Sequence, residues 1–385
     1  MPTVALGTPA KPASGDPIKI FFFNEEGASA AASSPESFQA AEAAVDYVNK
    51  NLGGVQGRPL ALTHCATLGT PDSVTNCANR AVDAKPDVVV KGVEVNSASA
   101  VPIITSAGIP YLTQNAGAPA EQATSGAFVL SSGFAALLSP VIPYAKAKGY
   151  KNIGVVYTNV TSLATALDGT VRKLAEKEGV GYTSVPVGIT TADMTPAYSS
   201  LLAKKVDAIY VVTSLPQCAS AFKARASLSD KTPLFTASGC NDPTAITTVT
   251  PTATDGMIVS LPDTSSVPTD PDTKIYRSAM KQYQPAANIG SFAPSGFATI
   301  MNLYRAMSTV SDPSSLNAKS ITATLRGVKN TPLFMGGGKT FSCDGSAFPK
   351  SPSICTGASF LTRYSQGSYQ LVDSYDTSAL LTGIS

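Results

Sequence analysis

Charged residues are scarce in this sequence, and their two signs nearly cancel. Only 14% of the 385 residues are charged, with 28 basic against 26 acidic side chains and a formal net charge of +2. Without a large basic patch, nucleic acids and anionic membrane surfaces are poor partners. Because 43% of the residues are hydrophobic, the chain has enough core-forming residues to fold, and its length favours two lobes.

Long apolar runs are also absent. No run reaches the roughly 18 to 20 residues of a bilayer span. The N-terminal stretch MPTVALGTPAKPASGDP lacks the positive start and the apolar segment of a secretion signal. Residues 1–16 are therefore predicted to be a Pro/Ala/Ser/Gly tether. Such a tether often follows an export signal, so we expect an exported protein whose signal is absent from this chain.

Histidine occurs once, as His64, and no C-x-x-C pair exists. His64 directly precedes Cys65, and alternation along a strand points the two side chains to opposite faces, which argues against zinc. A Cys–His hydrolase needs a base beside its thiolate, and His64 lies far along the chain from Cys240. The run MGGGK (335–339) lacks the spacing of a phosphate-binding loop. We therefore expect no catalytic constellation, no metal site and no cofactor.

The six cysteines are more consistent with disulfides than with zinc. Six cysteines allow about 15 pairings. Closing a short loop costs little chain entropy, and disulfides persist in oxidising compartments. We therefore expect an extracytoplasmic protein, either periplasmic or at the cell surface or secreted. Sequence order favours the pairs Cys65–Cys77, Cys218–Cys240 and Cys343–Cys355, which close loops of 12, 22 and 12 residues.

Apolar runs alternate with amphipathic runs between residues 18 and 260. Several runs are apolar nearly throughout, which is typical of strands buried on both faces of a parallel sheet. Repeated strand–helix alternation implies right-handed crossovers and doubly wound sheets, so the predicted fold class is α/β. The expected strands are 18–23, 59–65, 87–95, 109–114, 152–158, 207–214, 233–238 and 256–262.

Helix signals lie between and after these runs. Ser34 is the expected N-cap of the first helix, Pro35 lies in its first turn, and Gly53 stops it. The C-terminal stretch 359–375 is predicted to be a hairpin around Gln366-Gly367. Further helices are expected at about 273–284, 293–310 and 317–327.

Four stretches, taken in order, resemble type I periplasmic binding proteins of the leucine/isoleucine/valine-binding branch. They are NLGGVQGRPLALTHC, VPIITSAGIPYLTQNAGAP, DMTPAYSSLLAKKVDAIYVV and TDGMIVSLP. The resemblance covers about residues 17 to 375. It implies two doubly wound lobes joined by three hinge crossings, with a ligand cleft between them. Lobe 1 is expected to combine 17–132 with 262–338, and lobe 2 to combine 133–261 with 339–385.

The carboxyl ends of the strands are where open α/β sheets bind ligands. Small polar residues and free backbone N–H groups at these ends suit a polar head group, although single residues there can also be ordinary caps and turns. Ser97 is additionally a candidate helix N-cap. The candidate ligand-binding residues are Glu25, Asn96, Ser97, Asn115, Ala116, Gly117, Asn159, Ser162, Ser214, Asn241 and Asp242.

This set departs from the pattern of branched-chain amino acid binders. The Ala-x-Thr of that pattern reads Asn115-Ala116-Gly117, and two positions that are often Tyr read Ser162 and Ser214. The acid expected near Gly239 is missing, and Asp242 is the nearest carboxylate. The ligand therefore stays open between an amino acid-like molecule and a small organic acid or amide.

The resemblance implies a binding protein and not an enzyme. The expected function is extracytoplasmic capture of a small polar ligand for an ABC importer, whose membrane permease is the partner of a monomeric binding protein. The alternative is a ligand-sensing domain of a receptor or regulator with the same fold. In both cases the Cys218–Cys240 bridge is expected to brace two adjacent ligand loops.

Overall fold

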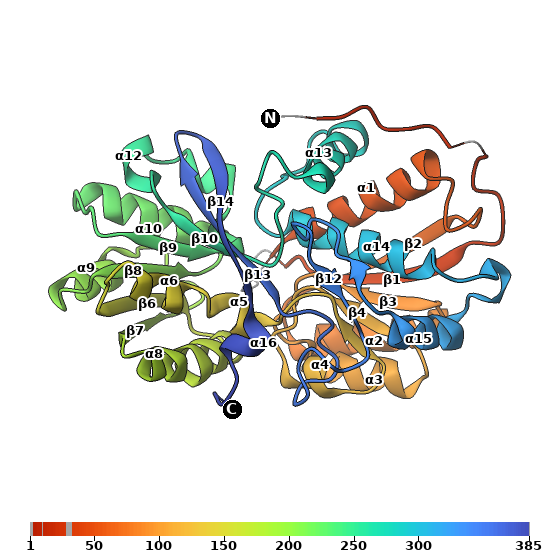
Figure 1. Ribbon diagram of the computed structural model, residues 1–385, viewed down its shortest axis with the longest axis horizontal. Coiled ribbons are helices and arrows are strands. Elements are labelled where there is room, and N and C mark those ends of the chain that lie inside the picture. Colours follow the sequence, from red (N-terminus) through yellow and green to blue (C-terminus); the bar gives the residue numbers. More distant parts are fainter. Residues whose placement is uncertain (1–2, 10, 28–32, 385) are drawn as a thin grey trace. The chain divides into compact units, whose positions relative to one another are not determined.

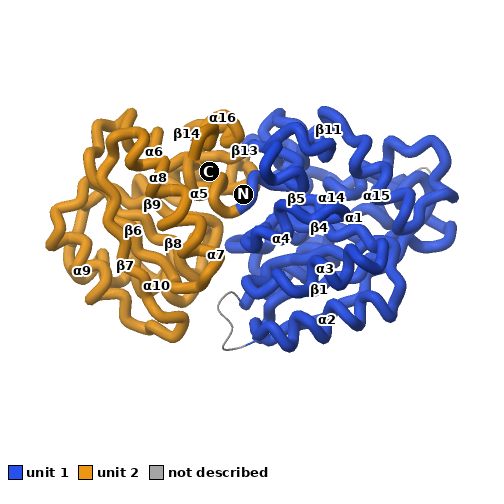
Figure 2. The backbone as a smooth tube through the Cα atoms, turned by 90° about the horizontal axis from the view of Figure 1, so that it is seen from below, with its two compact units in different colours: residues 1–133, 269–358 blue, residues 134–268, 359–385 orange. Residues whose placement is uncertain are grey.

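The computed structural model describes residues 3–9, 11–27 and 33–384. The chain forms two compact units and passes from one to the other three times (Figure 2). Both units are α/β and contain mainly parallel sheets, as the sequence predicts. Unit 1 combines Met1–Gly133 with Thr269–Ala358, and unit 2 combines Phe134–Pro268 with Ser359–Ser385.

Within the described residues, unit 1 contains a parallel five-stranded sheet in the order β2-β1-β3-β4-β5 (Figure 1). The two directions of strand order meet at β1 and β3, so this sheet is doubly wound. β5 was not expected from the sequence, because only three residues of the stretch pair. The strands are β1 (Ile18–Glu25), β2 (Leu60–Thr67), β3 (Val88–Lys91), β4 (Tyr111–Thr113) and β5 (Ala127–Val129), with a separate pair β11 (Thr331–Pro332) and β12 (Thr340–Phe341).

Helices cover both faces of this sheet. On one face α1 packs along α14, and Gly296 makes that contact possible, because a Cβ there would lie 1.9 Å from the Ser37 carbonyl oxygen. On the other face, α2 and α3 enclose an apolar cluster with Phe23 and Tyr111. The helices are α1 (Pro35–Asn51), α2 (Pro71–Ala84), α3 (Ala100–Ser106), α4 (Pro119–Ala123), α13 (Pro271–Tyr283), α14 (Ala293–Met307) and α15 (Ala318–Gly327), with 3₁₀ turns η1 (Ser97–Ser99) and η4 (Pro313–Ser315).

The first helix begins and ends where the sequence predicts. Ser34 is its N-cap residue and Pro35 its first helical residue, although the Ser34 side chain makes no capping hydrogen bond. Gly53 follows with φ +77°, a conformation that glycine adopts without steric cost. Several of the buried residues of α1 are alanines, and their small side chains let the helix lie close to the sheet.

In unit 2, the described residues form a seven-stranded sheet in the order β14-β13-β10-β9-β8-β6-β7. β13 runs antiparallel to β10, and β13 and β14 form the hairpin expected around Gln366-Gly367 (Figure 1). Edge strand β7 was missed, because it is only partly buried and carries Pro186, which an edge tolerates. The strands are β6 (Asn152–Thr158), β7 (Gly181–Val187), β8 (Ala208–Val212), β9 (Leu234–Ala237), β10 (Ile258–Leu261), β13 (Ala358–Ser365) and β14 (Ser368–Asp376).

Helices cover the unit 2 sheet, and its strands contribute to two buried apolar clusters. One cluster includes Tyr210 and Phe235, and the other includes Phe222 and Val259. The helix after β6 includes a π-helical segment, η2 (Thr165–Val171). The remaining elements are α5 (Phe134–Leu138), α6 (Val141–Ala147), α7 (Thr161–Ala164), α8 (Arg172–Glu178), α9 (Thr195–Ala203), α10 (Leu215–Ser227), η3 (Ser238–Cys240), α11 (Pro243–Ile246), α12 (Pro251–Thr254) and α16 (Thr377–Leu380).

The structure assigns two segments to a different unit than the sequence suggested. Residues 339–358 belong to unit 1, because the backbone of Val129 donates to the Ser353 carbonyl at 2.7 Å and accepts from the Cys355 amide at 2.9 Å. Residues 262–268 belong to unit 2, where Ser266 contacts Thr362 of β13. The sequence pattern shows neither of these contacts.

All six cysteines are described, and they form the three pairs that sequence order favours: Cys65–Cys77, Cys218–Cys240 and Cys343–Cys355. Each bridge lies within one unit. No helix among the described residues is long and apolar enough to cross a membrane.

Candidate functional site

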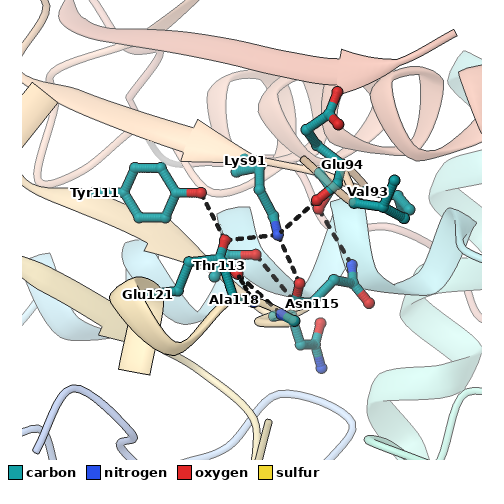
Figure 3. A network of polar contacts seen from close by, with 12 residues as sticks. Lys91, Val93, Glu94, Tyr111, Thr113, Asn115, Ala118 and Glu121 are labelled. Atoms are coloured by element: carbon teal, nitrogen blue, oxygen red, sulfur yellow. Dashed lines mark hydrogen bonds and ion pairs between the residues drawn. The ribbon is translucent and has the colours of Figure 1, made fainter. Parts of the chain in front are cut away.

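The carboxyl edge of the unit 1 sheet contains a buried network of charged and polar groups (Figure 3). At its centre, Lys91 ends β3 and Glu121 lies in α4. The Lys91 Nζ lies 2.7 Å from the Glu121 Oε1, and both side chains are fully buried. The Lys91 Nζ also donates to the carbonyl oxygen of Asn115 at 2.6 Å. One ion pair therefore joins the ends of two strands to a helix.

The second carboxylate oxygen of Glu121 accepts two backbone hydrogen bonds. The amides of Gly117 and Ala118 both donate to the Glu121 Oε2 at 2.9 Å. The hydroxyl of Tyr111 donates to the Glu121 Oε1 at 2.7 Å (Figure 3). Glu121 thus satisfies the amides of the two residues that precede its own helix, and so fixes the loop that contains them.

The loop after β3, residues 92–97, is held by carboxylates and one amide. A Cβ at Gly92 would lie 2.4 Å from the Asn24 Oδ1, so only glycine fits there. That Asn24 oxygen accepts from the Val93 amide at 2.7 Å. The carboxylate of Glu25 accepts from the Val95 amide at 3.1 Å. The end of β1 thereby sets the path of the neighbouring loop.

Glu94, in the same loop, is a buried acid beside another acid. Its carboxylate accepts from the Thr67 hydroxyl and, at 2.8 Å, from the Asn96 amide. Burial raises the pKa of Glu94 to about 7, with the hydrogen bond from Thr67 opposing this rise and the negative charge of Glu25 adding to it. Glu94 therefore changes its charge near neutral pH.

The structure brings the candidate residues of unit 1 into this neighbourhood, although several of their side chains already have partners within the protein. The Nδ2 of Asn115 donates to the Ser295 hydroxyl at 2.8 Å, and the Nδ2 of Asn96 donates to the Gly69 carbonyl at 2.8 Å. Ala116 is buried in a small apolar cluster, and Gly117 offers its amide to Glu121. These contacts hold the strand-end loops in place.

Ser97 is not the N-cap that the sequence suggested. It is the first residue of the 3₁₀ turn η1, and Asn96 takes the cap position without a side-chain capping bond. The helix that follows starts only at Ala100. β3 itself ends at Lys91, four residues before the predicted end of that strand.

Gln114 is a residue that the sequence reasoning passed over. It follows β4 directly and is only 2% exposed. Neither its Oε1 nor its Nε2 has a hydrogen-bond partner within the described residues, whereas its backbone carbonyl accepts from the Ser131 hydroxyl. A buried amide without partners is costly, so the side chain is suited to receive a donor and an acceptor from a bound molecule. The sequence signal was its position, one residue before the candidate Asn115.

In unit 2, Gln217 organises the corresponding strand ends. Its Oε1 accepts from the Thr158 hydroxyl at 2.5 Å and from the Ser214 hydroxyl at 3.4 Å. Its Nε2 donates to the Gly188 carbonyl at 2.8 Å. The ends of β6, β7 and β8 are thus joined through one buried amide. Sequence reasoning named Ser214 and missed Gln217.

The other unit 2 candidates lie at the ends of β6 and β9. Asp242 is buried and caps α11, with its Oδ1 accepting from the Thr244 amide at 2.7 Å. Asn241 is also buried beside it. The amide of Asn159 donates to the Val187 carbonyl at 2.7 Å, and the Ser162 hydroxyl is buried with no partner within the described residues.

The Cys218–Cys240 bridge joins the start of α10 to the turn η3 after β9. The hydroxyl of Thr213, at the end of β8, lies 3.4 Å from the Cys218 sulfur and 3.8 Å from the Cys240 sulfur. The bridge therefore braces two neighbouring strand-end loops. Among the residues that the structure describes, no three His, Cys, Asp or Glu side chains gather in a way that would hold a metal ion.

The sequence matches the periplasmic binding protein family over residues 17–351. None of the curated proteins matches it. Among solved structures, a fatty acid ABC transporter substrate-binding protein from Thermomonospora curvata is similar, with a TM-score of 0.80 at 17% identity, over 98% of this chain and 96% of that one.

Two further solved structures share the fold. A leucine binding protein from Thermotoga maritima has a TM-score of 0.74 at 17% identity, over 93% of this chain and 98% of that one. A solute binding protein from R. palustris in complex with benzoate has a TM-score of 0.75 at 16% identity, over 93% of this chain and 96% of that one. Family and fold are those of binding proteins and not of enzymes, and this chain belongs to the periplasmic binding protein family, as a type I member.

Proposed function

We propose that this protein is an extracytoplasmic solute-binding protein that captures a small polar molecule and delivers it to an ABC importer. The observation that carries the proposal is Gln114, a buried amide with no partner among the described residues, at the carboxyl edge where α/β sheets bind ligands. The three disulfides support an oxidising compartment outside the cytoplasm. The membrane permease of the importer is the partner that this role requires.

The chemistry of the site favours a ligand with a carboxylate or amide head group. The Gln114 Nε2 is a donor suited to a carboxylate or carbonyl oxygen, and its Oε1 is an acceptor suited to an N–H group. Leucine, benzoate and fatty acids, the compounds associated with the three similar proteins, all carry a carboxylate. We also propose that the unit 2 candidates, among them Ser162 and Asn241, contact the ligand.

A thermal-shift screen tests this function. The panel contains L-leucine, benzoate, octanoate and the amide of each. A compound at about 100 times its dissociation constant adds about 2.7 kcal/mol to the free energy of unfolding, and the melting temperature rises accordingly. We expect at least one carboxylate or amide to raise it in the wild type and to have a weaker effect on Gln114→Leu. The proposal is contradicted if no carboxylate or amide shifts the wild type.

A further inference from the structure

We propose that Glu121, held in place by Lys91, is a positioning residue that fixes the loop 114–118 in its ligand-binding conformation before any ligand arrives. The inference rests on the proposed function only in naming what this loop is for. The arrangement of the loop in the ligand-free protein is tested separately.

The contacts of Glu121 are directed at the backbone of this loop. Both loop amides, of Gly117 and Ala118, converge on one carboxylate oxygen at 2.9 Å. The other oxygen accepts from Tyr111 and pairs with Lys91, so the carboxylate has a partner on each side and a fixed orientation. Hydrogen bonds to a charged acceptor are stronger than neutral ones, and here they restrain consecutive residues.

Lys91 restrains the same loop nearer its start. Its ammonium donates to the Asn115 carbonyl at 2.6 Å and lies 3.5 Å from the Glu94 carbonyl in the loop after β3 (Figure 3). The loop is therefore fixed at its start by Lys91 and at its end by Glu121. Gln114, with its unpartnered amide, lies immediately before the first of these restraints.

The fold does not need charges at this place. Burying two charges costs several kcal/mol per ion, and well-packed apolar residues often replace a buried pair without loss of stability. The pair borders an apolar cluster that includes Val89, Phe23 and Tyr111. What apolar side chains cannot supply is an acceptor aimed at two amides. A loop ordered in advance lowers the entropy that binding must overcome.

Two double variants separate positioning from packing. Lys91→Met/Glu121→Leu removes both charges and the acceptor. Lys91→Met/Glu121→Gln also removes both charges, but the Gln side-chain oxygen still accepts from the loop amides. The matched control is Arg225→Met/Asp230→Leu, which removes a buried ion pair of unit 2 with an N–O distance of 2.8 Å that contacts no residue of this loop.

Amide hydrogen exchange of the ligand-free proteins is the primary measurement. In Lys91→Met/Glu121→Leu we expect the amides of Gly117 and Ala118 to exchange at least about tenfold faster than in the wild type. Lys91→Met/Glu121→Gln and the Arg225/Asp230 control should stay within about threefold of the wild type at these amides. Urea unfolding of each variant reports any general loss of stability.

Two results overturn the inference. In one, both double variants exchange faster than the wild type at Gly117 and Ala118 and to the same extent. In the other, both exchange at the wild-type rate. If the Leu variant does not fold, the Gln variant and the single variant Glu121→Gln decide. In them, loop amides that exchange as fast as in the urea-unfolded chain count against positioning, and amides that stay protected support it.

Binding is the second measurement. Titration with L-leucine and benzoate should show at least about tenfold weaker binding to the Leu variant than to the Gln variant, for whichever of these compounds binds the wild type. If neither compound binds the wild type, the proposed function loses support, whereas the exchange result still decides whether Glu121 positions the loop.

Discussion

The Lys91 Nζ lies 2.7 Å from the Glu121 Oε1, and neither side chain has exposed surface. A buried ion pair of this kind behaves asymmetrically on substitution. We predict that Lys91→Met alone lowers the free energy of unfolding by about 3–5 kcal/mol, because it leaves an unpaired buried carboxylate. Adding Glu121→Leu should recover most of this loss. Urea unfolding curves measure both, and a single variant as stable as the wild type would contradict the prediction.

Glu94 predicts a pH dependence of stability. Its pKa is raised from 4.5 to about 7 in the folded protein, so between these values the folded state binds more protons than the unfolded chain. The free energy of unfolding should therefore fall as the pH rises through this window, by up to about 3 kcal/mol.

Urea unfolding at several pH values between 5 and about 8 measures this slope. Glu94→Gln should flatten it, because the variant has no proton to lose there. The exposed control Glu176→Gln should keep the wild-type slope. A wild type whose stability rises across the window would show that Glu94 does not behave in this way.

The close packing of α1 against α14 predicts that one added methyl group, at Gly296, lowers the stability strongly. A Cβ at Gly296 would lie 1.9 Å from the Ser37 carbonyl oxygen, which is backbone and has no room to move away. Gly296→Ala should therefore cost about 1–3 kcal/mol or more in free energy of unfolding. Gly327→Ala is the control, since nothing lies within 4 Å of that Cβ, and its melting temperature should equal or exceed that of the wild type.

Gln114 predicts opposite effects on stability and binding. Gln114→Leu removes a buried amide without partners in the described residues, so the ligand-free variant should be at least as stable as the wild type. The same change should weaken binding of the ligand found in the screen by about tenfold or more. Thermal melting and calorimetric titration measure the two effects. A variant that binds with full affinity would place the ligand elsewhere.

The three disulfides can be tested by mass spectrometry. Intact-mass spectrometry of the unreduced protein should show no free thiol, and digestion should give the linked peptides of Cys65–Cys77, Cys218–Cys240 and Cys343–Cys355. Detection of six free thiols would contradict both the pairing and the proposed compartment. Reduction should destabilise the protein, because each bridge limits the unfolded chain.

The parallel sheets were predictable because fully buried strands leave an apolar run in the sequence, as β6 and β8 do. Edge strand β7 was missed because its side chains are mostly half-exposed and its pattern resembles a loop. The unit containing residues 339–358 was also not predictable, because backbone bonds to Val129 decide it.

For the candidate site, the strand ends were predictable and the partners were not. Lys91 gave a signal, since a lysine ends a run of valines, but Glu121 is 30 residues further on and only the fold brings the two together. Gln114 and Gln217 were missed because small polar residues were the expected ligand contacts. Gln217 has a long side chain that joins several strand ends, and the Gln114 amide is buried without a partner in the described residues.

The division of each unit into two stretches of sequence has a consequence for how the chain is made. All strands of the five-stranded sheet are synthesised before residue 130, but α14, which covers one of its faces, follows only at Ala293–Met307. The other sheet likewise waits for β13 and β14 at Ala358–Asp376. Contacts so distant in sequence form slowly. A nascent chain of this protein therefore keeps one face of the first sheet uncovered until α14 is made, and any factor that binds unfolded polypeptide has access to that face during this time.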